Sequence, residues 1–350
     1  MRIAQVSPLA ESVPPKLYGG TERIVSYLTE ELVRQGHEVT LFASGDSRTA
    51  AKLHSIVDTA LRFDPRIKDP QVFNMLQIEA VRDRAVEFDV IHFHTDYLHF
   101  PIARELPPGK VLTTLHGRLD QPGYPAMFAR HRHLPLVSIS NAQRRPLPDA
   151  NWAGTVLHGL PTTVCAYEPS SQGGYLAFLG RISPEKRVDR AVEIARRAGM
   201  RLKVAAKVDA ADRAYFTREI EPLFRQPHVE FVGEIGEADK CEFLGQARAL
   251  LFPIDWPEPF GLVMIEAMSC GAPCVAWREG SVAEIINEGV SGFIVNNIDD
   301  AVAAVHRSAQ LDRGRVRATF EQRFSAERMT REYVDIYRRL AASGSGKVAA

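Results

Sequence analysis

The feature that most constrains the fold is one order of elements that the chain contains twice. In the first half, residues 2–6 form an expected buried strand, which is followed by a glycine-bearing loop at 18–21. A helix is expected over 24–33, because apolar residues recur there on one helical face, and Gly36 ends it as a left-handed cap. The next strand is expected at 37–43.

The second half repeats this order. A strand at 175–179 leads into the loop 180–186, where Ser183 suits an N-cap and Pro184 the first position of a helix. An amphipathic helix follows, Gly199 ends it, and another strand begins. Because strands alternate with helices, the sheets are expected to be parallel. Two fresh starts imply two sheets, each with its own core.

Further apolar runs fit buried strands of these sheets. They lie at 90–93, 111–114, 136–139, 201–206, 230–232, 249–252 and 273–276. The predicted fold class is therefore α/β, with two Rossmann-like, doubly wound parallel-sheet domains facing each other across a cleft. Ligands of open α/β sheets bind at the carboxyl ends of the strands, so both glycine-bearing loops are expected to open onto that cleft.

The length of 350 residues exceeds one typical domain and suits two. The N-terminal domain, on the acceptor side, is expected at 1–160 and the C-terminal, donor-binding domain at 175–325. The segment 161–174 is rich in Pro, Ser, Thr and Gly and is expected to be the linker. Residues 326–340 carry an apolar helical face and are expected to cross back to the first domain, whereas 341–350 should form a flexible tail.

Charge and hydropathy exclude several classes of protein. The 43 basic and 43 acidic residues give a formal net charge of zero and are mixed along the chain, which argues against binding of nucleic acid. No apolar run approaches the roughly 18 residues that a membrane span needs. The N-terminus is too short and too interrupted for a signal peptide, so a cytoplasmic enzyme is expected.

The four cysteines are Cys165, Cys241, Cys270 and Cys274. Only the last two are close in sequence, and no histidine follows them at the spacing of a metal site. Small buried residues in a reducing compartment are therefore expected, rather than disulfides or a zinc site.

The most informative segment is 255–271, which follows an apolar strand. Two prolines hold Glu258 in an extended loop, and a helix is expected to begin near Phe260. The first turn of such a helix presents backbone N–H groups and attracts anions. The helix is apolar almost all round, so the charged Glu266 within it needs partners. From spacing alone, a structural role and a ligand-binding role for Glu266 stay equally open.

The two glutamates, the Pro-Phe-Gly after the first and the turn 269–273 resemble the Glu-x7-Glu signature of the family 4 retaining glycosyltransferases, which have the GT-B fold. The resemblance implies that Glu258 approaches the donor sugar and that Glu266 binds the nucleotide ribose. A carboxylate with two acceptor oxygens suits a vicinal diol. The backbone implied to hold the sugar and the phosphates is that of Phe260, Gly261 and Leu262.

Arg181 and Lys186 lie in the loop of the second half. A guanidinium fork and an ammonium both suit a diphosphate, although composition alone would make them solvated loop cations. The loop resembles the Gly-Arg-x4-Lys segment of the same family, in which the arginine and the lysine hold the donor pyrophosphate. The resemblance covers about residues 1–340 and is clearest from 180 to 295.

Two segments of the first half complete the predicted site. Gly19 and Gly20 stand at a helix start and resemble the family's loop near the donor phosphates, on the acceptor side. His116 follows a strand within Thr-Leu-His-Gly, where the family has a histidine beside the donor sugar, which implies a role in sugar positioning and transition-state support. His92, His94 and Asp96 could be metal ligands, but polar residues lining the ends of strands are the favoured interpretation.

The chain contains no Asp-x-Asp pair of the kind that holds a divalent ion against a diphosphate in metal-dependent glycosyltransferases. We therefore expect no cofactor and no metal requirement. The predicted function is a retaining transfer of a sugar from a nucleoside-diphosphate sugar, UDP being favoured, to an acceptor hydroxyl. The alternatives are a nucleotide-sugar epimerase, a phosphorylase, or a nucleotide-sugar-binding protein without catalysis. A dinucleotide oxidoreductase is disfavoured because neither glycine loop reads Gly-x-Gly-x-x-Gly.

The acceptor is open between a glycan, a lipid and a small molecule. Five arginines stand between 117 and 148 against few acidic residues, namely Arg118, Arg130, Arg132, Arg144 and Arg145. Two interpretations of this stretch stay open: a solvated surface, or a basic face for an anionic acceptor or lipid headgroups at the inner face of the membrane. The base, the sugar, the linkage and the oligomeric state do not follow from the sequence.

Overall fold

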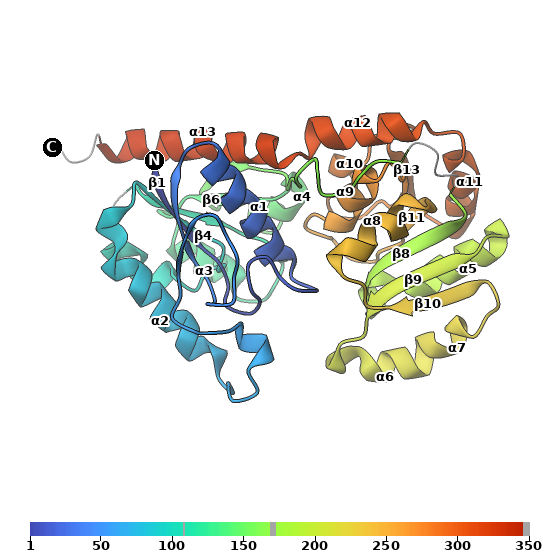
Figure 1. Ribbon diagram of the computed structural model, residues 1–350, viewed down its shortest axis with the longest axis horizontal. Coiled ribbons are helices and arrows are strands. Elements are labelled where there is room, and N and C mark those ends of the chain that lie inside the picture. The colour runs from blue at the N-terminus through green and yellow to red at the C-terminus, as the bar shows by residue number, and fades with distance from the viewer. Residues whose placement is uncertain (108, 169–172, 346–350) are drawn as a thin grey trace. The chain divides into compact units, whose positions relative to one another are not determined.

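The computed structural model describes residues 1–107, 109–168 and 173–345. The chain divides into two compact units (Figure 1). Unit 1 comprises Met1–Gly159 and the chain from Ala326 onward, and unit 2 comprises Leu160–Ser325. Each unit is built around one parallel sheet.

The sheet of unit 1 has seven parallel strands in the order β3-β2-β1-β4-β5-β6-β7. These strands are β1 (Arg2–Val6), β2 (Glu38–Phe42), β3 (Lys52–His54), β4 (Val90–Phe93), β5 (Val111–Thr114), β6 (Leu136–Ser138) and β7 (Trp152–Thr155). Its central strands carry fully buried residues on both faces, as expected of a parallel sheet covered by helices.

The helices of unit 1 connect these strands and cover the sheet (Figure 1). They are α1 (Gly20–Arg34), α2 (Pro70–Asp83), α3 (Tyr124–Arg130), α4 (Asn141–Arg144) and α13 (Ala326–Ser345), with 3-10 turns at Leu61–Phe63, Ala85–Glu87 and Phe100–Glu105. The α13 helix packs against α1, and its Tyr333 and Tyr337 are fully buried.

The sheet of unit 2 has six parallel strands in the order β10-β9-β8-β11-β12-β13. They are β8 (Tyr175–Arg181), β9 (Leu202–Lys207), β10 (Val229–Gly233), β11 (Ala247–Phe252), β12 (Cys274–Trp277) and β13 (Gly292–Val295).

The helices of unit 2 follow the same alternation. They are α5 (Val188–Ala198), α6 (Arg213–Tyr215), α7 (Glu221–Phe224), α8 (Glu237–Gly245), α9 (Leu262–Ser269), α10 (Val282–Ile285), α11 (Ile298–Ser308) and α12 (Arg313–Arg323), with 3-10 turns at Pro184–Lys186 and Ala210–Asp212 and a π-helical turn at Phe216–Ile220.

The predicted α/β class with two doubly wound parallel sheets is confirmed. The edge strands β3 and β7 were not predicted, because each is short and only partly buried. Ser183 stands at the N-cap position of a short 3-10 turn rather than of the long helix, which begins at Val188 after the left-handed Arg187. The α13 helix continues through residues 341–345, which were expected to be part of a flexible tail, because the helical stretch runs on past Leu340. Residues 346–350 of that tail lie outside the described residues.

The segment expected to be a linker is fastened to unit 2 over its described part. Leu160 forms a β-bridge with Ser325, and the Arg317 guanidinium of α12 donates to the carbonyl oxygens of Thr162, at 2.5 Å, and Cys165, at 3.2 Å. These contacts place residues from Leu160 onward in the second compact unit. Residues 169–172 lie outside the described part of the chain.

The strand order of each sheet reverses direction at one point. In unit 2 the chain moves outward from β8 to β9 and β10, then returns to the other side of β8 with β11. In unit 1 the corresponding neighbours are β1 and β4. Loops that leave the carboxyl ends of such neighbours diverge to opposite faces and leave a crevice, which is where open α/β sheets bind ligands.

Candidate functional site

The loops after β8 and β11 meet at the carboxyl edge of the sheet of unit 2. The Asp255 N–H donates to the Glu185 carbonyl oxygen at 2.8 Å, which joins the two loops through the backbone. The Lys186 ammonium forms a short ion pair with the Glu258 carboxylate. Two residues that are 72 positions apart in sequence are therefore brought together because β8 pairs directly with β11.

The Lys186–Glu258 pair is largely withdrawn from solvent. The two side chains are 17% and 13% exposed. The Lys186 Nζ lies 5.0 Å from the centre of the Trp256 ring and 5.8 Å from that of Phe252, within the range of cation–π attraction. This cation is therefore held between aromatic faces and one carboxylate.

The Glu258 loop is shaped by a second loop, after β12. The Ser281 N–H donates to the Glu258 carbonyl oxygen at 3.0 Å, and the Ser281 hydroxyl donates to the Phe260 carbonyl oxygen at 2.7 Å. Gly280 has a positive φ of 53°, and a Cβ placed there would overlap the backbone of Glu258. Position 280 therefore requires glycine for two independent reasons, left-handed backbone and close approach.

The α9 helix begins at Leu262, with Gly261 as its N-cap residue, one turn after Glu258. Its Phe260 neighbour is buried, and the first-turn residues Leu262 and Val263 are only partly buried. The helix was expected to begin near Phe260; it starts two residues later. Its N-terminal end closely follows Glu258 along the chain. It presents backbone N–H groups of the kind that bind anions.

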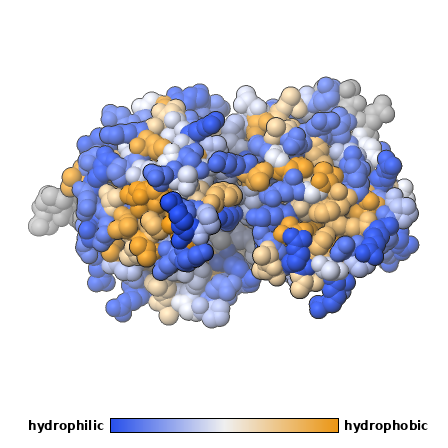
Figure 2. Space-filling view, turned by 60° about the horizontal axis from the view of Figure 1, so that its bottom comes forward, coloured by the Kyte–Doolittle hydropathy of each residue, from blue (hydrophilic) through white to orange (hydrophobic). Residues whose placement is uncertain are grey.

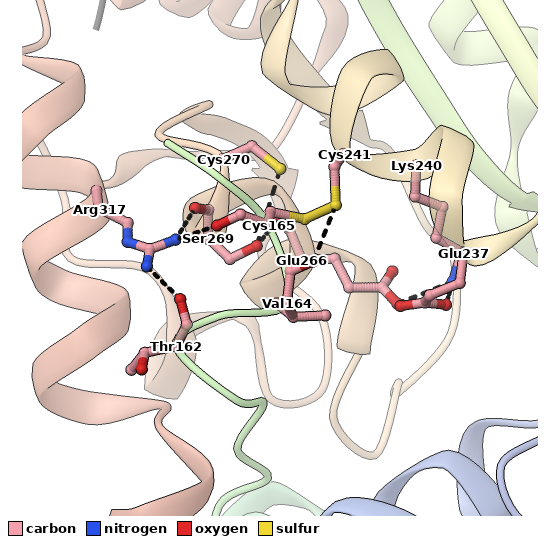
Figure 3. Close-up of a disulfide and its surroundings, with 10 residues drawn as sticks. All are labelled: Thr162, Val164, Cys165, Glu237, Lys240, Cys241, Glu266, Ser269, Cys270 and Arg317. Atoms are coloured by element: carbon pink, nitrogen blue, oxygen red, sulfur yellow. Dashed lines mark hydrogen bonds and ion pairs between the residues drawn. A yellow bond between two sulfur atoms is a disulfide. The ribbon is translucent and has the colours of Figure 1, made fainter. Parts of the chain in front are cut away.

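Glu266 lies on α9 and is paired by a residue that the sequence did not single out. Lys240 of α8 lies 3.0 Å from Glu266 Oε1 and 3.3 Å from Glu237 Oε2 (Figure 3). The Glu266 side chain is 10% exposed, whereas that of Glu237 is 35% exposed. The charge on the apolar α9 helix thus has a cationic partner, and the second oxygen of Glu266 leaves further acceptor capacity for a ligand.

Arg181 ends β8 among three acidic side chains. Its guanidinium lies 3.1 Å from Glu185, 3.6 Å from Asp209 and 3.5 Å from Asp212. These contacts hold the guanidinium at the carboxyl end of β8. The structure therefore brings Arg181, Lys186 and Glu258 to one edge of the sheet, while Glu266 lies on the helix that follows.

Two of the cysteines are joined by a disulfide, so the expectation of four unlinked cysteines is wrong. Cys165 and Cys241 are bonded across 76 residues, with a Cα–Cα distance of 5.3 Å (Figure 3). The reason is that the expected linker packs against α8 and α12 instead of standing apart from unit 2. Cys270 and Cys274 are buried free thiols, as expected.

One group of residues in the described chain has the composition of a metal site. The sulfur atoms of Cys165, Cys241 and Cys270 all lie within 4.8 Å of one another. Two of these sulfurs are in the disulfide and cannot act as thiolate ligands while it is intact. Burial also raises the pKa of the Cys270 thiol to about 11, which keeps that sulfur protonated.

Gly19 and Gly20 lie at the start of α1, as predicted. Gly19 is the N-cap residue, and its carbonyl oxygen accepts from the Arg23 N–H at 3.1 Å. A Cβ at Gly19 would lie 2.7 Å from the Cβ of Pro15, so close packing against Pro15 requires glycine. Glu22 of the first turn is buried, and burial raises the pKa of its carboxyl.

His116 follows β5 and is tied to a buried cluster of neutral side chains. Its Nε2 lies 2.9 Å from His94 Nδ1, and His94 Nε2 lies 2.8 Å from Gln5 Oε1. Burial lowers the pKa of His116 to about 3, so its ring is neutral. The His92 and His94 rings do share one face of the sheet, and their nitrogens bond to protein side chains, as the favoured interpretation of polar strand ends expected.

Asp96 lies three residues after β4 and has a backbone conformation that few residues adopt. Its φ is 50°, and its carboxylate accepts a hydrogen bond from the backbone N–H of His116. Desolvation raises the pKa of the Asp96 carboxyl to about 6, although the residue as a whole stays exposed. Left-handed backbone at a non-glycine residue is typical of functional sites.

The five arginines between 117 and 148 do not form one uniform face. Arg118 pairs with Asp120 at 2.7 Å, and Arg144 lies over the Trp152 ring at 5.0 Å. Arg130, Arg132 and Arg145 are exposed. Figure 2 shows that apolar side chains reach the surface in patches on the face of the molecule that it draws. The large apolar residues exposed in unit 1 are Leu17, Tyr18, Phe63, Val72, Met75, Leu76 and Val86.

Two family models together match most of the chain. Residues 18–154 match the glycosyltransferase family 4 model, and residues 167–323 match the model of glycosyl transferases group 1. With the two parallel-sheet units, they define a glycosyltransferase of the GT-B fold. The chain belongs to glycosyltransferase family 4, as the resemblance of its motifs predicted.

Two curated relatives illustrate the range of this family. The chain is 25% identical to the alpha-maltose-1-phosphate synthase of Mycobacterium tuberculosis, over 97% of this chain and 100% of that protein. It is 29% identical to the N-acetyl-alpha-D-glucosaminyl L-malate synthase of Bacillus anthracis, but that match spans only a third of each protein, 33% of this chain and 32% of the relative.

Solved structures agree on the fold. AviGT4, a glycosyltransferase involved in avilamycin A biosynthesis, is 25% identical and superposes with a TM-score of 0.75 over 98% of both chains. HepE of Anabaena, solved with UDP and glucose, is 18% identical, with a TM-score of 0.69 over 96% of this chain and 98% of that one.

Proposed function

We propose that this glycosyltransferase moves a sugar from a nucleoside-diphosphate sugar to an acceptor hydroxyl, with retention at the anomeric carbon. The observation that carries the proposal is the contact of Lys186 with Glu258 at the carboxyl edge of β8 and β11, beside the start of α9. The arrangement offers a cation and helix N–H groups for a diphosphate and a carboxylate for sugar hydroxyls within one small region. UDP is the proposed nucleotide, in line with the UDP bound to HepE.

The donor site changes partners when the nucleotide sugar binds. The diphosphate takes over the Lys186 ammonium, and Glu258, released from its ion pair, accepts hydrogen bonds from hydroxyls of the sugar. Arg181 contributes a second cation, and Glu266 accepts from the ribose hydroxyls while it stays paired with Lys240. Backbone groups of Phe260, Gly261 and Leu262 hold the sugar and the phosphates.

The chemistry follows from where charge develops. Breaking the glycosyl–phosphate bond leaves negative charge on the diphosphate, and fixed cations and helix N–H groups stabilise it. The leaving phosphate acts as base for the acceptor hydroxyl on the same face of the sugar, so Glu258 binds sugar and is not a nucleophile. His116, whose pKa of about 3 keeps it neutral, positions the donor sugar and is not a general acid. Gly19 and Gly20 belong to the proposed phosphate side of the site.

This chemistry has no step that needs a metal ion, because Arg181 and Lys186 supply the positive charge. We propose metal independence, which a transfer assay in excess chelator checks: undiminished turnover supports it, and recovery that needs added Mg²⁺ or Mn²⁺ contradicts it.

We propose the acceptor by its chemical class and the place of action by its compartment. A glycan, a lipid or a small molecule is proposed as acceptor, and the protein is proposed to act in the cytoplasm. No helix among the described residues is long and apolar enough to cross a membrane. Peripheral contact with anionic lipids through Arg130 and Arg132 is proposed from their exposure. Salt-sensitive binding to anionic liposomes that charge reversal of both arginines abolishes would support it.

The experiment that tests the function starts with binding. Thermal shifts with UDP, GDP, ADP and TDP identify the nucleotide, because a ligand that binds only the folded state raises the melting temperature. Hydrolysis of UDP-glucose, GDP-mannose, ADP-glucose and TDP-glucose without acceptor then separates a transferase from a protein that only binds. Glu258→Gln should lower this hydrolysis and weaken binding of the sugar nucleotide but not of the free nucleotide. Full activity and donor affinity in Glu258→Gln would show that the assignment is wrong.

A further inference from the structure

Unit 1 contains a continuous chain of hydrogen-bonded side chains that ends at His116. It links the C-terminal helix α13 with the carboxyl ends of β1, β4 and β5, three neighbouring strands. The members, in order, are Tyr333, Thr114, His92, Tyr337, Gln5, His94 and His116. The first six are at most 1% exposed.

The direction of each bond between Gln5 and His116 follows from the orientation of the Gln5 amide, whose Nε2 faces Tyr337 and whose Oε1 faces His94. Gln5 Nε2 donates to the Tyr337 hydroxyl at 3.1 Å, and Gln5 Oε1 lies 2.8 Å from His94 Nε2. An amide oxygen only accepts, so His94 Nε2 carries the hydrogen. Burial lowers the pKa of His94 well below its usual range, and a neutral imidazole has one N–H. His94 Nδ1 is therefore bare.

The same rule fixes the tautomer of His116. Its Nε2 lies 2.9 Å from the bare His94 Nδ1 and must donate to it. His116 Nδ1 is then without hydrogen. Among the described residues this Nδ1 atom is buried and has no hydrogen-bond partner. The His116 ring is also stacked on His158, with centres 5.3 Å apart and planes 16° apart, so its rotation is restricted.

We propose that Gln5 and His94 are positioning residues that hold His116 as the Nε2–H tautomer, with Nδ1 kept as a hydrogen-bond acceptor. The proposal rests on the proposed function, because it gives the form in which His116 meets a substrate hydroxyl. A hydroxyl that meets Nδ1 must donate its hydrogen. The two residues touch no reacting atom and act only through His116.

The chain can also run in the opposite direction, which is the rival outcome. If Tyr337 donated to Gln5 and Gln5 donated to His94, every later bond would reverse, and His116 would carry its hydrogen on Nδ1. Such a His116 would donate to a substrate oxygen instead of accepting. The orientation of the Gln5 amide therefore decides the chemistry of a ring two hydrogen bonds away.

The direct test is the protonation pattern of His116 in the full-length protein. With ¹⁵N-labelled histidine, and His116→Gln to assign the signals, the ¹⁵N shifts distinguish a protonated ring nitrogen from a bare one. We expect His116 to show a protonated Nε2 and a bare Nδ1 at neutral pH. A protonated Nδ1, or rapid averaging of the two tautomers, would overturn the proposal.

A pair of variants separates positioning from stability. His94→Leu removes the partner of His116, whereas the matched control His99→Leu removes another fully buried imidazole, which bonds to Thr113 at 2.8 Å. His94→Leu should lower kcat for hydrolysis of the nucleotide sugar by up to about 100-fold, which is the loss expected when a positioning group is misplaced. It should also give mixed His116 tautomers. UDP should still raise its melting temperature as in the wild type. Equal loss of kcat in both variants would refute a specific role.

Two further variants test whether His94 and Gln5 act through His116. In a His116→Gln background, His94→Leu should cause no additional loss of kcat, because two residues that act as one unit are not additive. Gln5→Met, which also serves if His94→Leu does not fold, should disturb the His116 tautomer with a smaller loss of kcat; an unchanged tautomer contradicts the role of Gln5. If the wild type cleaves no nucleotide sugar of the panel, the proposed function fails, while the ¹⁵N shifts still decide the tautomer.

Discussion

The carboxyl edges of the two sheets carry opposite kinds of chemistry on the same kind of framework. At the β8–β11 edge of unit 2, Lys186, Arg181 and Glu258 are charged and held in ion pairs. At the β1–β4–β5 edge of unit 1, the polar side chains are neutral and are held by directional hydrogen bonds, with His94 and His116 as examples.

We interpret this difference in terms of the two substrates of the proposed reaction. An ion pair can exchange its carboxylate for a phosphate with little rearrangement, so the edge of unit 2 suits a charged group that arrives and leaves. A neutral chain has fixed donors and acceptors and can tell one hydroxyl orientation from another. The comparison predicts that changes in unit 2 act on charge and that changes in unit 1 act on orientation.

The largest effect is expected from removing the cation of unit 2. Lys186→Met keeps the length and apolar stem of the side chain but removes the charge that faces the diphosphate. We expect kcat for donor hydrolysis to fall about 100- to 1000-fold, the range found when one preorganised donor to a developing charge is removed. The measurement is steady-state hydrolysis of the nucleotide sugar that the wild type cleaves fastest.

A lysine of the same unit provides the control. Lys203 of β9 pairs with Glu230 at 3.6 Å and lies 4.6 Å from the centre of the Tyr175 ring, much as Lys186 lies over Trp256. Lys203→Met should keep kcat, because Lys203 is not at the carboxyl edge. If both substitutions lower kcat alike, the charge of Lys186 has no special role.

The sequence alone was sufficient to predict the two-sheet framework and the loops that carry the charged residues. The periodicity of apolar residues and the positions of glycines predicted the central strands, such as β1 and β8. They also predicted the first long helix of each unit, α1 and α5. Gly261 and Glu266 fall on α9 and its cap because the apolar run and its flanking turns are local signals. The roles of these residues stay predictions, since they rest on the family resemblance.

The pairings within each site could not be predicted, because they depend on which strands become neighbours. Lys186 meets Glu258 only because β8 lies beside β11 in the sheet, and His94 meets His116 only because β4 lies beside β5. Lys240 carries no motif of its own and gains its role from the packing of α8 on α9. Sequence spacing likewise gave no sign of the bond from Cys165 to α8, 76 residues away.

A smaller effect, on affinity, is expected at Glu266. Glu266→Gln replaces a charged acceptor for the ribose hydroxyls by a neutral amide, and a hydrogen bond to a charged group contributes about 1.5–3 kcal/mol. The dissociation constant of UDP, measured by titration calorimetry, should therefore rise about 10- to 160-fold. Glu237→Gln is the matched control, because Glu237 contacts the same Lys240 from α8. Equal weakening in both variants would mean that Lys240, and not the ribose, accounts for the effect.

The smallest effect per residue is expected from low pH on folding stability, and it should differ between the two units. Burial lowers the pKa of eight histidines of unit 1, five of them most strongly, whereas unit 2 contains only His228 and His306. The five are His92, His94, His99, His116 and His158. A histidine with a lowered pKa in the folded state binds its proton more readily when unfolded, so stability present above pH 6.5 is lost as the pH falls towards 3.

At one pH unit below the ordinary histidine value, each fully buried ring should cost unit 1 about 1.4 kcal/mol of its free energy of unfolding. Asp96 opposes this trend, because its raised pKa of about 6 makes its protonated form favourable in the folded state. Hydrogen exchange at pH 5.5 and 7.5, corrected for intrinsic rates, should therefore show that β4 and β5 lose protection on acidification before β8 and β11.

His99→Phe should reduce this loss of protection, because it removes one titrating group and because Phe93 already stacks on that ring at 3.8 Å. The exposed His306→Gln should not. Equal loss of protection in both units would show that the buried histidines do not set the acid stability of unit 1.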